Sequence, residues 1–278
     1  MISVASGKGG TGKTTVAVNM ALSMQEPVQL IDCDVEEPNA HIFLKPRIDA
    51  VRPVYVPVPK VDHALCDRCG KCAEFCQFHA IAVVPERTMV FSHLCHGCGG
   101  CRLVCPKKAI TEVDREVGVI KTGTAGRIDF SYGELSLGEP MPGPVIRELK
   151  RNVNPTRITI IDSPPGTSCP VIQSVWGTDY CILVTEPTPF GLHDLELMVG
   201  LLRQMGIPFG VVVNRAGIGD TKVYDYCRKE GVPILLEIPF DKAIAELYSE
   251  GTPFVTRMHE WKDKLASLAT RAKEAAVK

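Results

Sequence analysis

The sequence predicts an α/β protein with a doubly wound, mostly parallel sheet that is interrupted by a small inserted α+β domain. Apolar strand-like runs alternate with helix-compatible segments in residues 1–59 and again in residues 114–278, as in βαβ units. A glycine-rich loop follows the first of these runs, and residues 60–113 contain two groups of closely spaced cysteines. We therefore expect a core formed by residues 1–59 and 114–278, with residues 60–113 as the insert.

The glycine-rich loop spans residues 7–15 and fits the pattern G-x-x-x-x-G-K-[ST], between a strand-like run and a helix-compatible segment. Glycines let successive backbone N–H groups surround an anion at a helix N-terminus. The motif predicts a site for ATP or ADP with Mg²⁺, in which Lys13 reaches the β- and γ-phosphates and the Thr14 hydroxyl is a ligand of the metal. The predicted nucleotide-binding positions are Gly9, Gly10, Thr11, Gly12, Lys13, Thr14 and Thr15.

A second lysine in the loop, Lys8, is not required for phosphate binding and adds positive charge beside the γ-phosphate. With Lys8 included, the loop resembles the deviant Walker A motif of the MinD/ParA superfamily of P-loop ATPases. That superfamily also contains the nitrogenase iron protein and metal-cluster carrier ATPases. The resemblance implies an ATPase that forms a homodimer on binding ATP, with Lys13 acting in its own subunit and Lys8 acting on the nucleotide of the other.

Aspartates end two of the apolar runs, where parallel strands present ligand-binding residues. Asp32 and Asp34 end one run, and Asp162 ends another, just before a proline-rich turn that contains Gly166. The resemblance implies that Asp34 positions or deprotonates the attacking water and that Asp32 lies beside the Mg²⁺ shell. It further implies that Asp162 holds Mg²⁺ through a water and that Gly166 offers its N–H to the γ-phosphate. The alternatives are a solvated acidic turn and a proline-stiffened loop.

Two later positions are candidates for adenine contacts. In the second part of the core, Asn214 ends one strand-like run and Pro239 follows another. In the family that the loop resembles, such positions contact adenine through an asparagine amide and a backbone loop. We expect Asn214 and Pro239 to do so here.

Eight of the 12 cysteines form two runs of the type C-x-x-C-x-x-C-x-x-x-C. This repeat is the pattern of bacterial ferredoxins with two [4Fe–4S] clusters, in which the fourth cysteine of each run ligates the other cluster. One departure is that Gln77 follows the first run, where the pattern has proline. Two zinc sites or a disulfide knot are the alternatives. The pattern assigns one cluster to Cys66, Cys69, Cys72 and Cys105, and the other to Cys76, Cys95, Cys98 and Cys101.

Composition narrows the possible partners. The 278 residues include 31 basic and 32 acidic side chains, so the total charge does not indicate a nucleic-acid surface. No apolar run approaches the roughly 18 residues of a membrane span, and the first residues do not form a signal peptide. In the tail, Trp261, Leu265, Leu268 and Ala272 share one helical stripe, which favours packing on the core over a membrane anchor. We expect a cytoplasmic protein.

These features predict a Mg²⁺-dependent, dimeric ATPase that couples hydrolysis to electron transfer through two [4Fe–4S] clusters. A different hypothesis is an iron–sulfur or metallocluster scaffold or maturation carrier, which would hand its cluster to another protein. A third is a redox-gated ATPase that positions other proteins. Each implies a redox or metallocluster partner protein that the sequence does not name.

Overall fold

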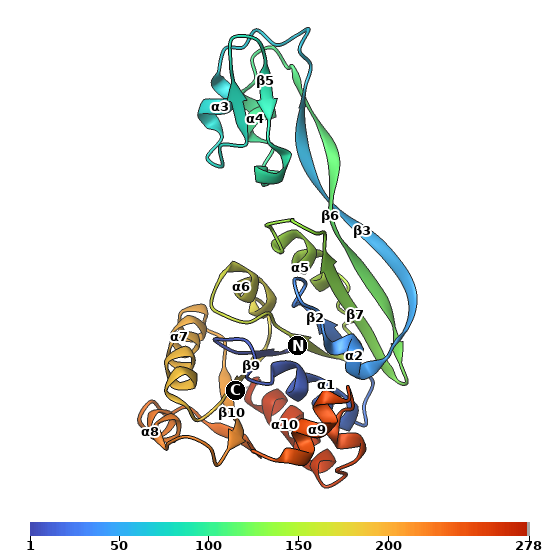
Figure 1. Ribbon diagram of the computed structural model, residues 1–278, viewed down its shortest axis with the longest axis vertical. Coiled ribbons are helices and arrows are strands. Elements are labelled where there is room, and N and C mark those ends of the chain that lie inside the picture. Colours follow the sequence, from blue (N-terminus) through green and yellow to red (C-terminus); the bar gives the residue numbers. More distant parts are fainter. Residues whose placement is uncertain (277–278) are drawn as a thin grey trace.

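The computed structural model describes residues 1–276 and shows a core and a smaller cysteine-containing module, which we call the cysteine module, residues 62–109. A long two-stranded arm made by β3 (Arg47–Val61) and β6 (Ile110–Ala125) carries the module away from the core (Figure 1). The expected insert boundaries, residues 60 and 113, fall inside these two strands rather than in loops.

The core is built on a nine-stranded sheet in the order β11-β10-β9-β1-β8-β2-β7-β6-β3. All neighbours from β11 to β7 are parallel, whereas β6 is antiparallel to both β7 and β3. The expected mostly parallel sheet is thus confirmed, with an antiparallel edge that carries the module. The remaining strands are β1 (Ile2–Ala5), β2 (Val28–Asp32), β7 (Ile128–Leu135), β8 (Ile158–Asp162), β9 (Tyr180–Thr185), β10 (Phe209–Ala216) and β11 (Ile234–Pro239).

Helices cover both faces of the sheet, because the central strands are apolar on both sides. Val4 and Leu30 pack with one group of helices, while Ala5 and Ile31 face the other, and all four are buried. The first face holds α1 (Lys13–Ser23) and α10 (Trp261–Ala276), with α2 (Ala40–Leu44), α9 (Lys242–Ser249) and the short η2 (Phe254–Thr256) nearby. The second face holds α5 (Gly143–Lys150), α6 (Cys169–Val175), α7 (Pro189–Met205) and α8 (Lys222–Lys229).

The tail forms α10, which packs against α1. Its stripe of Trp261, Leu265, Leu268 and Ala272 is buried in the core, as the spacing predicts. Within residues 1–276, no helix combines the length and the apolar character that crossing a membrane requires.

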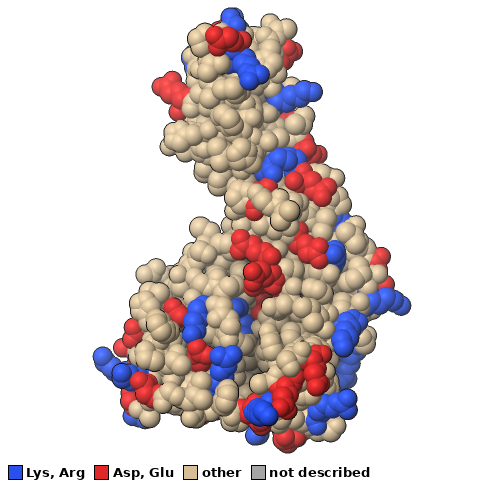
Figure 2. All heavy atoms as spheres, viewed as in Figure 1, with Lys and Arg blue, Asp and Glu red and all other residues tan. Residues whose placement is uncertain are grey.

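The cysteine module contains α3 (Lys71–Phe75), α4 (Gly100–Val104), a hairpin of β4 (Ile81–Val83) and β5 (Thr88–Val90), and the short η1 (Ser92–Leu94). Its apolar core is small and is shared with the arm. Ile81 packs with two buried cysteines and with Ile110 of β6, while Ala80 packs with a third and with Val58 of β3. Figure 2 shows that the side of the module turned toward the core is mostly uncharged, whereas cations and anions are interspersed over the viewed face of the core.

Candidate functional site

A cavity of about 320 Å³ lies at the carboxyl edge of the core sheet. It opens between the glycine-rich loop, the segment after β2, the end of β10, and the end of β11 with the residues that follow it. The structure therefore brings together residues that are more than 200 positions apart in the chain. The predicted nucleotide residues that line it are Gly9, Gly10, Gly12, Lys13, Thr14, Thr15, Asp34, Asn214 and Pro239.

The loop begins α1 in a conformation that requires glycine. Gly12 is the residue before the helix and has φ 96°, in the left-handed region. A Cβ at this position would also collide with the side-chain nitrogen of Asn214. The Asn214 amide donates a hydrogen bond of 2.8 Å to the carbonyl of Thr11, so Asn214 braces the loop in addition to lining the cavity. Fixed backbone N–H groups at a helix N-terminus suit the binding of an anionic phosphate.

Asp32 and Asp34 differ in their surroundings. The Asp32 carboxylate accepts hydrogen bonds from the backbone N–H groups of Asp34 (3.0 Å), Asn39 (3.1 Å) and Ala40 (3.0 Å), so it shapes the loop after β2. Burial raises its pKa to about 7. Asp34 faces the cavity, and burial raises its pKa to about 6, while the nearby Lys13 acts to lower it. A carboxyl group with a raised pKa is suited to accept a proton from water near neutral pH.

Asp162, at the end of β8, is fully buried, and neither of its carboxylate oxygens forms a hydrogen bond with the described residues. Burial and the charge of Asp32 raise its pKa well above the ordinary value. Burial in turn lowers the pKa of Lys13, which the three aspartates counteract. A hard divalent cation would satisfy these unpaired oxygens, so the residues present fit a Mg²⁺ site.

Two predicted residues have partners within their own chain. The Lys8 ammonium pairs with Glu186, which follows β9 and also accepts a bond of 2.9 Å from Arg215. The N–H of Gly166 donates to the carbonyl of Ser6 at 3.0 Å. Both contacts must break before Lys8 can reach a second subunit or Gly166 a phosphate. The sequence reasoning missed Glu186, although an acidic residue directly after an apolar run is a detectable signal.

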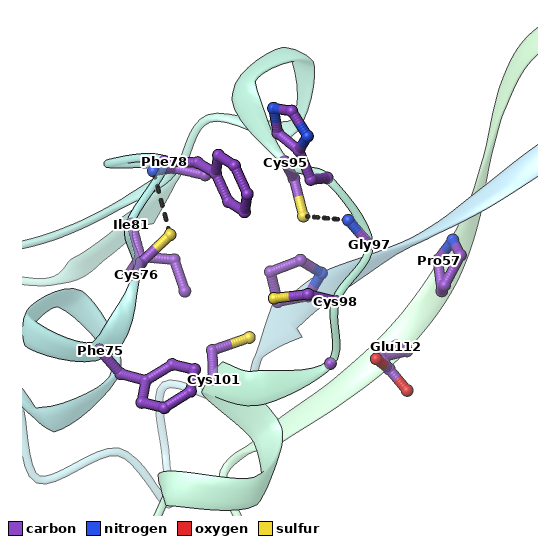
Figure 3. Close-up of a pocket in the computed structure, with 14 residues that line it drawn as sticks. Pro57, Phe75, Cys76, Phe78, Ile81, Cys95, Gly97, Cys98, Cys101 and Glu112 are labelled. Atoms are coloured by element: carbon purple, nitrogen blue, oxygen red, sulfur yellow. Dashed lines mark hydrogen bonds between the residues drawn. The ribbon is translucent and has the colours of Figure 1, made fainter. Parts of the chain in front are cut away.

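The eight clustered cysteines surround two separate cavities in the cysteine module. Cys76, Cys95, Cys98 and Cys101 line the first, and in Figure 3 their thiols point into a common space. Cys66, Cys69, Cys72 and Cys105 line the second. The first cavity is rimmed mainly by apolar side chains. The rim of the second combines apolar side chains with four charged ones, Asp67, Arg68, Lys71 and Lys107.

Backbone N–H groups point at several of these sulfurs. The Sγ of Cys95 accepts from Gly97 at 3.5 Å, that of Cys76 from Ala80 at 3.4 Å, and that of Cys105 from Ala109 at 3.4 Å. Such bonds stabilise negative charge on sulfur and are common where thiolates bind metal clusters. Burial raises the pKa of Cys101 to about 11, so in the absence of metal this thiol is protonated at neutral pH.

In each cavity four thiols line one common space. In residues 1–276, no group of three or more His, Cys, Asp or Glu side chains is arranged to hold a single metal ion. All 12 cysteines are free, so the alternative of a disulfide knot does not match the structure. Four thiols around a cavity fit a group with several metal atoms, and the two sets of four are the ones that the cysteine spacing predicts.

Comparison with known proteins defines the class. Residues 2–254 match the family described as the CobQ/CobB/MinD/ParA nucleotide binding domain, and the chain belongs to that family. It is a P-loop ATPase of the MinD/ParA type, as the loop sequence suggested.

Individual relatives cover nearly the whole chain. An uncharacterized protein from Methanocaldococcus jannaschii is 30% identical over 264 residues, which cover 92% of this chain and 91% of the relative. The iron-sulfur cluster carrier protein of Pyrococcus abyssi is 27% identical over 274 residues, covering 91% and 78%. Among solved structures, the septum site-determining protein MinD of Pyrococcus horikoshii, complexed with Mg-ADP, has a TM-score of 0.60 and 20% identity, covering 97% and 94%. At that identity the likeness concerns the fold alone.

Proposed function

We propose that this protein is a Mg²⁺-dependent ATPase that dimerises on binding ATP and couples its nucleotide cycle to electron transfer through two [4Fe–4S] clusters. The observation that carries the proposal is the arrangement of the eight cysteines around two cavities, in a module joined to the edge of an ATPase sheet. The two strands of its arm lie in sequence between β2, which precedes Asp34, and β8, which ends at Asp162. Both segments line or adjoin the nucleotide cavity.

The roles in hydrolysis follow from the geometry of the cavity. The loop N–H groups and Lys13 bind the phosphates, while Thr14 and Asp162 hold Mg²⁺, which when bound neutralises phosphate charge. Asp34 accepts a proton from the attacking water. Lys8, once released from Glu186, stabilises the charge that develops on the γ-phosphate of the other subunit. Asn214 and Pro239 remain our candidates for adenine contacts.

The module supports a resident metal group by its size as well as by its thiols. A unit this small, with an apolar core of only a few side chains, normally needs a metal or a disulfide in order to fold stably. The cysteines form no disulfide, so bound metal is the remaining source of cross-linking. When bound, [4Fe–4S] clusters supply one-electron redox chemistry, and the four thiolates of each cavity hold and orient them.

A second candidate function is cluster carriage. Several relatives at 24–28% identity, including those of Pyrococcus abyssi and Aquifex aeolicus, are iron-sulfur cluster carrier proteins by name. In this chain Cys69 and Cys98, one from each cavity, are exposed, which would let an acceptor protein reach a ligand. We favour electron transfer because each cavity has a full set of four thiols and three of the eight are buried.

Anaerobic purification followed by iron analysis and electron paramagnetic resonance tests the proposal. We expect about eight iron atoms per chain and about four after either C69A or C98A, since each removes one ligand of one cluster. The matched control is C169A, which changes an exposed cysteine at the start of α6, and it should retain about eight.

The same preparation separates the two candidate functions. For electron transfer, the clusters should be reduced and reoxidised with their iron retained, and MgATP should change the spectrum of the reduced protein. Iron that moves to an acceptor lacking its cluster would support carriage instead. If C69A and C98A both kept their full iron content, the assignment of one cluster to each cavity would be contradicted.

A further inference from the structure

The arm that carries the cysteine module changes character where it leaves the core. Strand β7 pairs with β6 only as far as Gly118, beyond which β3 and β6 form a two-stranded ribbon. The register of that ribbon shifts between Val54 and Tyr55, opposite Gly118 and Glu116, so Val117 forms a bulge at this point. Two-stranded ribbons are marginally stable and bulges bend a strand. Val117 itself is buried and accepts a hydrogen bond from the Ser136 N–H, so the part that can bend is the ribbon beyond it, and we call this position the hinge.

One ion pair joins the ribbon to the core just beyond the hinge. Arg115 of β6 pairs with Glu139, in the loop after β7, through Nη1 to Oε2, and its Nη2 lies 3.4 Å from Oε1. The Glu139 side chain is 3% exposed and that of Arg115 is 20% exposed. Two bonds to a shielded carboxylate make this a strong, directional contact, because Arg and carboxylate match in shape.

Arg115 also borders the cysteine module. Together with Thr88, Val90 and Ser92 of the module, it lines a shallow hollow beside the ribbon. Arg115 therefore adjoins the module as well as Glu139 of the core.

The loop that contains Glu139 is connected to the nucleotide cavity through two helices. It leads directly into α5, and a Cβ at Gly118 would lie 2.9 Å from the Val145 side chain of α5, so α5 packs against the hinge itself. At its other end, Lys150 of α5 donates to the carbonyls of Gln173 and Ser174 in α6, both at 2.9 Å. Helix α6 begins seven residues after Asp162. A movement of the turn after Asp162 would thus reach Glu139 through packed helices.

We propose that the Arg115–Glu139 ion pair is a brace that fixes the orientation of the cysteine module and links it to the helices beside the nucleotide cavity. Arg115 and Glu139 are positioning residues, since neither lines that cavity. This inference deepens the proposed function, because it gives the nucleotide cycle a physical route to the clusters. It makes no assumption about whether the clusters pass electrons or are handed on.

Hydrogen–deuterium exchange of residues 54–61 and 110–117 tests the brace in the whole protein. The substitution E139Q removes the negative charge, and we expect amide exchange in the ribbon to become about tenfold faster or more. The matched control is E134Q, which breaks the Lys121–Glu134 pair where β6 is held between β3 and β7, and it should leave the ribbon unchanged. The double variant R115Q/E139Q leaves no unpaired charge, so its effect should be smaller than the sum of the single effects.

A merely structural contact would not respond to nucleotide. We expect a non-hydrolysable MgATP analogue to alter ribbon exchange in the unmodified protein, and E139Q to abolish that response while keeping its affinity for the analogue. Ribbon exchange in E139Q equal to that of the unmodified protein would overturn the brace, and a nucleotide response that persists in E139Q would overturn the coupling. Ribbon exchange and its response to nucleotide are both measured on backbone amides, whereas the proposed function is tested by iron content. A failure of the brace can therefore be told apart from a failure of the proposed function.

Discussion

The contact between Lys8 and Glu186 allows a direct test of whether Lys8 acts on a second subunit. Glu186 holds Lys8 with one carboxylate oxygen and Arg215 with the other. If Lys8 reaches the nucleotide of another copy, this pair must break first. The substitution E186Q removes the charge that holds Lys8 but keeps the size of the side chain and an oxygen that accepts from Arg215. It should therefore favour the nucleotide-bound dimer.

The size of the effect follows from the burial of the pair. The side chain of Lys8 is 31% exposed and that of Glu186 is 9% exposed. Exposed ion pairs contribute up to about 1 kcal/mol to stability, whereas loss of one partner of a buried ion pair costs about 3–5 kcal/mol. Because the Lys8–Glu186 pair is half-buried, we assign it a value between these, about 1–2 kcal/mol. Since 1–2 kcal/mol is a factor of about 5–30 for each lysine and two lysines are released per dimer, the dissociation constant should fall at least about 25-fold.

Sedimentation equilibrium over a range of concentrations, with a non-hydrolysable MgATP analogue, measures that constant. The matched control is E230Q, which breaks the Arg203–Glu230 pair away from the cavity and should not change dimerisation. K8A should lose the nucleotide-dependent dimer. The reasoning would be refuted if E186Q bound the analogue as the unmodified protein does and dimerised no more tightly.

Two further predictions concern the nucleotide cavity without its ligands. G12A should lower the free energy of unfolding by about 1–2 kcal/mol, because the left-handed backbone disfavours a Cβ and Asn214 leaves no room for one. The control G9A places its Cβ in open space and should leave stability unchanged. Thermal unfolding of the two variants measures the difference. The pKa values of Asp32 (about 7) and Asp34 (about 6) in the folded protein exceed the value of about 4 for an aspartate in the unfolded chain. Between about pH 4 and pH 7 the folded state therefore binds more protons than the unfolded state. Stability without ligands should therefore fall as the pH rises from about 4 to about 7, and thermal midpoints that rise over this range would contradict the assignment.

Features that depend on neighbouring residues were accessible from the sequence. A phosphate loop uses backbone N–H groups of consecutive residues, so Gly12 and Lys13 are recognisable without a fold. The cysteine runs likewise follow a fixed spacing, and the four cysteines assigned to each cluster do line one cavity. The sheet was predictable because apolar strand-like runs alternate with helical segments.

Contacts between distant residues were not accessible. Glu186 lies 178 positions from Lys8, and Asn214 lies 203 positions from the Thr11 carbonyl that it supports. Nothing local to Asn214 distinguishes a residue that contacts adenine from one that braces the loop. The hydrogen bond from the Gly166 N–H to the Ser6 carbonyl could not be predicted from the sequence either, because any backbone N–H can donate to any carbonyl that the fold brings near.

The sequence by itself determined the class of ATPase, the eight cysteines and their grouping, because each of these depends on residue type at short, regular spacing. Only the tertiary structure decided that the cysteine module stands on a hinged ribbon beside α5, with Arg115 and Glu139 as its outer contact with the core. The physical reason is that burial and charge pairing arise between surfaces that meet after folding, and these interactions hold Lys8 on Glu186 of its own chain and Arg115 of the ribbon on Glu139 of the core.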